Sequence, residues 1–149
     1  MSTVTWLSQG GKLSPKFAIV VVYSGNSWRA RSKGSAMIRN GLYSYDSKAL
    51  DGGDGGYRGV AVLRDGSILG GGSFFYFTGT YSCSGGRWKG EATQQEHTPA
   101  PHTFATAGWN VSAGFTGTYT DEGAEFEATA LVGKRSLRYH ANLRLLKAD

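Results

Sequence analysis

The phrase "FTGTY" occurs twice, at Phe77–Tyr81 and at Phe115–Tyr119, and it indicates the fold. In a β-strand, alternate side chains point to opposite faces, so Phe, Gly and Tyr of each phrase share one face and the threonines share the other. A third Gly-x-Tyr at Gly41–Tyr43 places the three glycines 38 residues apart each time. Glycine beside tyrosine lets a strand coil tightly over a neighbour's ring, as a closing barrel requires. Because the 38-residue frames hardly match elsewhere, we interpret the phrases as a strand pattern rather than a repeated binding motif.

Short segments of alternating polar and apolar residues, separated by glycine-rich turns, fill the chain from residue 40 onward. They predict eight strands, at residues 41–46, 57–64, 67–71, 73–83, 87–96, 109–119, 123–132 and 136–147. The Asp65-Gly66 pair is a signal for a tight hairpin, and strands joined by tight turns pair antiparallel. The inward faces mix small residues with rings, which suits a small closed barrel. We therefore predict an all-β, eight-stranded antiparallel up-and-down barrel, with a two-sheet sandwich as the rival.

The segment His97–Gly108 is the longest break between the predicted strands, and we expect it to hold at most one short helical turn. His97 and His102 match no standard zinc spacing, so loop histidines are the better interpretation. The phrase "DGGDGG" at residues 51–56 lacks the following helix of a phosphate loop and the tandem copies of a calcium repeat. We interpret it as a hairpin loop, and we expect neither a metal nor another cofactor.

The net charge of +5 lies in the first part of the chain. Residues 1–36 hold five basic residues and no acidic one, whereas the other 11 basic residues balance all 11 acidic residues. Because the charges of residues 37–149 cancel, we expect no basic face that could bind nucleic acid on this part of the chain. Cys83 is the single cysteine, which excludes a disulfide within the chain, and we expect a merely structural thiol. No apolar run approaches the roughly 20 residues of a membrane helix, so we expect a cytoplasmic protein without nucleic acid or membrane as partner.

Composition also divides the chain into a basic N-terminal extension, residues 1–36, and a single barrel domain, residues 37–149. Three interpretations of the extension stay open. Translation starts at Met37 and the extension lies upstream; or the apolar run "FAIVVVY" at Phe17–Tyr23 is the core of a targeting segment; or that run is an added strand.

The inward faces predict a lumen without catalytic residues. The sequence contains no nucleophile elbow and no Cys/His pair, and Glu125, Glu127 and His140 all fall on outer faces. We therefore expect a non-enzymatic protein. Aromatic residues on the inward faces are the candidates for lining a ligand cavity, although they would equally well fill the barrel. They are Tyr43, Phe77, Tyr81, Trp88, Tyr119 and Tyr139.

Several phrases occur in a characteristic order: "NGLYS" at Asn40–Ser44, "GVAVLRDGSILGGGS" at Gly59–Ser73, "YFTGTYS" at Tyr76–Ser82, then His97 and Pro101. Together they resemble the GrlR-like family of type III secretion negative regulators, over residues 37 to about 146. The resemblance implies a lipocalin-like barrel that forms a homodimer and acts by binding a transcriptional regulator protein, without catalysis. One member of the family has four acidic residues in the turn that corresponds to Ser84–Arg87, and they are implicated in partner binding. In this chain the same turn contains no acidic residue. The partner-binding residues are therefore not transferred to this chain.

The "FTGTY" phrases followed by small polar residues are also similar to strands of the avidin-type barrels, which bind biotin in the lumen. Two functions follow from the sequence. The first is a regulatory or adaptor protein that acts by protein–protein binding. The alternative is a barrel that carries or senses a small apolar ligand.

Overall fold

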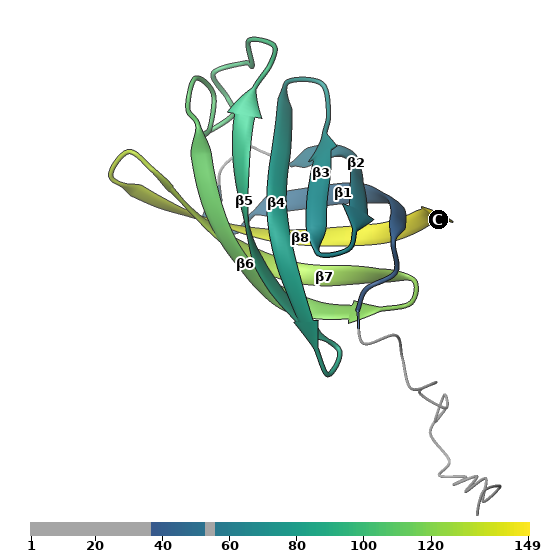
Figure 1. Cartoon of the computed structure of the whole chain (residues 1–149). Helices are drawn as coiled ribbons and strands as arrows, with labels where there is room; N and C mark the ends of the chain where they lie inside the picture. Colours follow the sequence, from purple (N-terminus) through teal and green to yellow (C-terminus); the bar gives the residue numbers. More distant parts are fainter. Residues whose placement is uncertain (1–36, 53–55) are drawn as a thin grey trace, which may run out of the picture. The chain divides into compact units, whose positions relative to one another are not determined.

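In the computed structural model, which describes residues 37–52 and 56–149, eight antiparallel strands form a closed barrel (Figure 1). The strands are β1 (Gly41–Ala49), β2 (Tyr57–Arg64), β3 (Ser67–Gly71), β4 (Phe75–Ser84), β5 (Arg87–Glu96), β6 (Val111–Thr120), β7 (Gly123–Val132) and β8 (Arg135–Ala148). Each strand pairs with the next along the chain, and β8 returns to pair with β1. The predicted up-and-down barrel is confirmed and the sandwich is wrong. The three interpretations of residues 1–36 concern a segment outside the described residues.

The two faces of each strand follow the alternation in the sequence. In β7, Phe126 and Ala130 are buried inside the barrel, whereas Glu125 and Glu127 are exposed outside it. In β5, Trp88 is buried between two exposed basic residues. This pattern is that of a barrel whose interior is filled by side chains from every second position.

The barrel has two different ends. At the hairpin end, β1 begins, β8 finishes, and two-residue turns join β2 to β3, β4 to β5 and β6 to β7. At the loop end lie the longer connections, residues 72–74 and 97–110, the described residues between β1 and β2 (50–52 and 56), and the turn at residues 133–134. The connections from β3 to β4 and from β5 to β6 are at the top of Figure 1.

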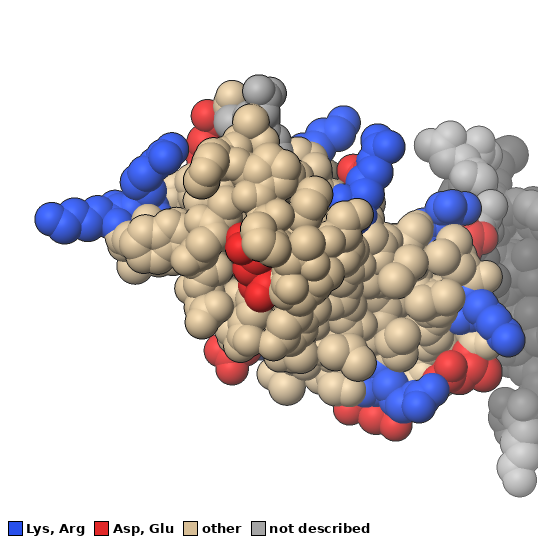
Figure 2. Space-filling view, turned by 90° about the horizontal axis from the view of Figure 1, so that it is seen from above, with Lys and Arg blue, Asp and Glu red and all other residues tan. Residues whose placement is uncertain are grey.

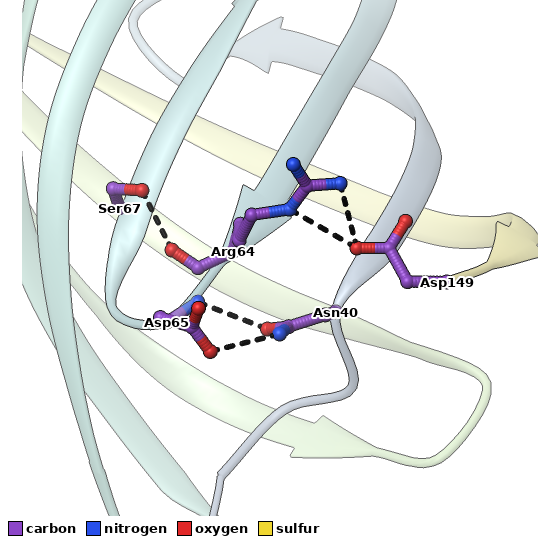
Figure 3. A network of polar contacts seen from close by, with 5 residues as sticks. All are labelled: Asn40, Arg64, Asp65, Ser67 and Asp149. Atoms are coloured by element: carbon purple, nitrogen blue, oxygen red, sulfur yellow. Dashed lines mark hydrogen bonds and ion pairs between the residues drawn. The ribbon is translucent and has the colours of Figure 1, made fainter.

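The turn between β2 and β3 holds both termini of the barrel at the hairpin end. Asp65 and Gly66 have φ angles of 49° and 85°, as the Asp-Gly pair predicts for a tight hairpin. The side chain of Asn40 accepts the Asp65 backbone N–H and donates to its carboxylate, both at 2.9 Å. Arg64 donates to the carboxylate of Asp149 through Nε (3.1 Å) and Nη2 (2.9 Å) (Figure 3). The chain therefore enters and leaves the barrel against the same hairpin.

Glycine is required in the two "FTGTY" phrases because neighbouring backbones come close. A Cβ at Gly79 would collide with the carbonyl oxygen of Glu91, and one at Gly117 with that of Glu125. The sequence predicts a ring at this contact, and the structure places backbone there instead. The phenylalanine rings of the phrases lie over other glycines, since Phe77 pairs with Gly70 and Phe115 pairs with Gly90 across the sheet.

The long connection at residues 97–110 consists of turns, and no helix occurs in it. The N–H of Phe104 donates to the carbonyl of Pro101, and the N–H of Ala107 donates to that of Phe104, each at 3.0 Å. Its Phe104 ring packs against Phe74 and Phe75 at the start of β4, with centroids 5.6 and 5.7 Å apart. The connection is thereby fixed over the loop end.

Candidate ligand cavity at the loop end

Aromatic rings fill the half of the interior next to the hairpin end. Trp88 lies at its centre, with ring centroids 4.7 Å from Phe115 and 5.1 Å from Phe126. Tyr81 packs edge-on against the same indole at 5.8 Å. Trp88 is 1% exposed and Tyr43, nearer the end, is fully buried. We call this region the ring-filled half.

The half of the interior next to the loop end contains a cavity of about 150 Å³. Alanines on neighbouring strands form one wall of the cavity, the alanine wall. Ala92 on β5 pairs with Ala113 on β6, and Ala113 pairs with Ala130 on β7. Ala128 lies two residues before Ala130 on the same face. Four methyl groups thus occupy inward positions where the other half carries rings, and they leave the space empty.

Rings form the opposite wall of the cavity. Tyr45 of β1 packs against Phe77 of β4, with centroids 5.2 Å apart. Tyr57 of β2 packs against Phe75 at 5.7 Å, and Phe104 of the long connection contributes to the lining above them. The site is therefore a slot between aromatic faces and alanine methyls, a surface suited to a flat apolar group.

A few polar groups lie among these walls. The Tyr57 hydroxyl donates to the carbonyl of Phe75 at 2.6 Å, and the Gln94 side-chain amide donates to Thr106 Oγ1 at 3.0 Å. Burial raises the pKa of Tyr45 and of Tyr139, as it does for Tyr57. These hydroxyls are therefore protonated at neutral pH and can act as hydrogen-bond donors.

The cavity reaches the surface at the loop end, where Asp51, Arg135 and Arg138 belong to its lining and are exposed. The carboxylate of Asp51 accepts the backbone N–H of Arg138 at 2.9 Å. Arg138 turns its guanidinium to Glu127, 3.0 Å away, on the outside of the barrel.

The structure divides the six inward aromatic residues that the sequence proposes as a lining. Phe77, Trp88 and Tyr139 line the cavity. Tyr43, Tyr81 and Tyr119 do not line it and instead belong to or pack against the main core cluster. Sequence reasoning missed Tyr45, Tyr57, Phe75 and Phe104, and it missed the alanine wall. The sequence shows that the inward residues 92, 113, 128 and 130 are small. Only the register between strands shows that residues 92, 113 and 130 are direct neighbours.

The other motifs of the sequence take structural positions. His97 contacts the carbonyl of Gly72 through Nε2 at 2.9 Å, which fixes the connection between β3 and β4. His140 lies on the outer face and pairs with Glu125 at 3.0 Å. Cys83 is a free thiol packed against the core. Within residues 37–52 and 56–149, no group of three or more His, Cys, Asp or Glu side chains could hold a metal ion. Gly53, Asp54 and Gly55 of the "DGGDGG" loop lie outside the described residues.

Charged side chains on the visible surface are spread out rather than gathered. Figure 2, which shows the molecule from above the view of Figure 1, has Lys and Arg in separate groups, several with Asp or Glu beside them. One example of such pairing is Arg58, whose Nε lies 2.7 Å from the carboxylate of Asp46.

Comparison with known proteins adds no family assignment. No protein-family model matches the chain, and no curated protein matches it. The resemblance to the GrlR-like regulators therefore stays a prediction. Among the described residues, no helix has the length and apolar character needed to cross a membrane.

Proposed function

We propose that the barrel is a non-enzymatic binding protein that takes up a small apolar ligand in the cavity at the loop end. The observation that carries the proposal is the empty slot between the alanine wall and the ring wall, in a barrel whose other half is filled. An apolar cavity of about 150 Å³ is large enough for one benzene-sized molecule. Drug-sized and larger ligands occupy pockets of roughly 300–1,000 Å³. Size therefore favours a compact ligand over a long-chain lipid.

A ligand series followed by NMR of the full chain tests this proposal. We expect benzene, toluene and benzyl alcohol to shift the methyl resonances of Ala113 and Ala130, and palmitate to leave them unchanged. Replacing Ala130 by Leu fills the slot and should weaken binding at least about tenfold. Thr129→Leu, which adds similar bulk on the outer face of the same strand, serves as the control. The proposal fails if no compound of the series shifts these methyls, or if a folded Ala130→Leu protein binds as the native chain does.

A second candidate function, a regulatory adaptor, is favoured by apolar side chains on the outside of the barrel. Leu42, Val62 and Leu69 lie in one row across β1, β2 and β3, because Leu42 pairs with Val62 and Val62 pairs with Leu69. Val60 extends the row along β2, and Leu69 is 59% exposed. We call these four residues the β1–β3 patch. Val60 is 47% exposed as well, whereas Leu42 and Val62 are half-buried. Contiguous apolar side chains on an outer surface are typical of interaction surfaces.

In this second proposal, the β1–β3 patch joins two copies of the chain into a homodimer, which binds a transcriptional regulator protein. Leu69→Glu should convert the dimer into a monomer, as measured by light scattering after size-exclusion chromatography. Leu131→Glu is the matched control, because Leu131 is also exposed on the outer face but lies on β7. A monomeric native chain, or equal masses for the native chain and the Leu69→Glu variant, would sink the proposal.

A further inference from the structure

The mouth of the cavity carries a cation that no described side chain neutralises. Arg135 occupies an inward-facing position at the first residue of β8, two residues before buried Leu137, and it belongs to the cavity lining. Its guanidinium forms no ion pair and no hydrogen bond with residues 37–52 or 56–149. Burial and then the nearby Asp51 carboxylate raise the pKa of Tyr139, and the charge of Arg135 lowers it by a smaller amount.

Three other charged groups at the loop end have partners within the protein. Arg138 is paired on the outer face with Glu127 at 3.0 Å. Asp51 accepts the backbone N–H of Arg138 at 2.9 Å, and Glu96 accepts that of Gly108 at the same distance. Of the two arginines in the lining, Arg135 is therefore the one whose charge is not paired with a described carboxylate.

The guanidinium of Arg135 and the apolar cavity behind it together indicate one class of ligand. A guanidinium recognises a carboxylate through two parallel hydrogen bonds and is the side chain best matched to that group. The cavity behind it accommodates one six-membered ring between Phe77 and the alanine wall. The protonated hydroxyl of Tyr139, on the same strand four residues from Arg135, can donate a further hydrogen bond to an anionic oxygen.

We propose that the cavity binds a single-ring aromatic carboxylate, with the ring in the slot and the carboxylate at Arg135. This inference rests on the proposed ligand-binding function and adds to it the charge of the ligand. Because the guanidinium lies at the mouth of the cavity, the carboxylate is attached either directly to the ring or through a short linker.

Calorimetric titration of the full chain with benzoate, benzyl alcohol and benzylamine tests the charge preference, with phenylacetate as the longer acid. We expect one of the two acids to bind at least about tenfold more tightly than benzyl alcohol, as a charge-assisted contact warrants. Arg135→Gln should abolish this preference, because it should weaken the binding of the acid much more than the binding of benzyl alcohol. Arg144→Gln, which removes an exposed arginine from the outer face of the same strand, should retain it.

The outcomes separate this inference from the function on which it rests. If benzyl alcohol binds but the acids bind no better, or benzylamine binds best, the charge preference is wrong and the ligand cavity stands. The same conclusion follows if Arg135→Gln keeps the preference for an acid. If none of the four compounds binds, both the inference and the proposed function fail.

Discussion

The two halves of the barrel interior share one architecture and differ in what fills it. In the ring-filled half, Trp88 packs against Phe115 and Phe126 with centroids about 5 Å away, and the cavity reaches only as far as these rings. In the half beside the loop end, strands β5 to β7 present Ala92, Ala113 and Ala130, and a cavity of about 150 Å³ remains. Side-chain size at a few inward positions thus separates a structural core from a candidate binding site.

The largest expected effect comes from breaking the ring-filled half. Trp88→Ala should lower the free energy of unfolding by about 3–5 kcal/mol, because it removes a buried ring and leaves a cavity. Trp109→Ala is the matched control, since Trp109 is 51% exposed and should cost less than about 1 kcal/mol. Urea unfolding of the two variants checks this. Equal losses would mean that Trp88 is not the centre of the core.

A smaller effect should follow from adding one methyl group beneath the same rings. Gly117→Ala should cost about 2–3 kcal/mol, since its Cβ would collide with the backbone of β7 next to Phe126. Gly114→Ala on the same strand meets no atom within 4 Å and should change stability by less than about 1 kcal/mol. Thermal unfolding compares the pair, and a Gly117→Ala protein as stable as Gly114→Ala would disprove the close approach of the strands.

Inserting the same side chain into both halves compares their spare volume directly. Ala141→Leu, at a fully buried position packed in the main core cluster, should destabilise by about 1–2 kcal/mol through overpacking. Ala130→Leu points into the cavity, so it should be neutral or slightly stabilising. Urea midpoints decide between them, and a larger loss for Ala130→Leu would show that the loop-end half has no usable space.

The smallest effect is confined to alkaline pH. Burial raises the pKa of Tyr43 in the ring-filled half to about 12, from 10.0 for the unfolded chain. Because the folded state holds this proton more tightly, its contribution to stability is complete below pH 10 and is lost as the pH rises toward 12. Tyr43→Phe should therefore lose less stability over this range than the native chain does. Identical pH profiles from pH 10 to 12 would exclude the effect.

The fold could be predicted from the sequence because alternation and turn chemistry are local. The Asp65-Gly66 turn fixes one hairpin, and the change of face between Phe126 and Glu127 fixes which side is buried. The cavity could not be predicted in the same way. Whether Ala92, Ala113 and Ala130 form one wall depends on the register between strands, which no single strand reveals. Tyr43 and Tyr139 both face inward, yet only their distance from the hairpin end decides that one fills the core and the other lines the cavity.

The most direct test of the central claim is a crystal structure of the native chain under xenon pressure, because xenon enters apolar cavities without any change to the protein. We expect a xenon atom in the loop-end half, between the alanine wall and Phe77, and none beside Tyr43 or Tyr81, which do not line the cavity. An interior without xenon, or a xenon atom beside Tyr43 or Tyr81, would contradict this claim.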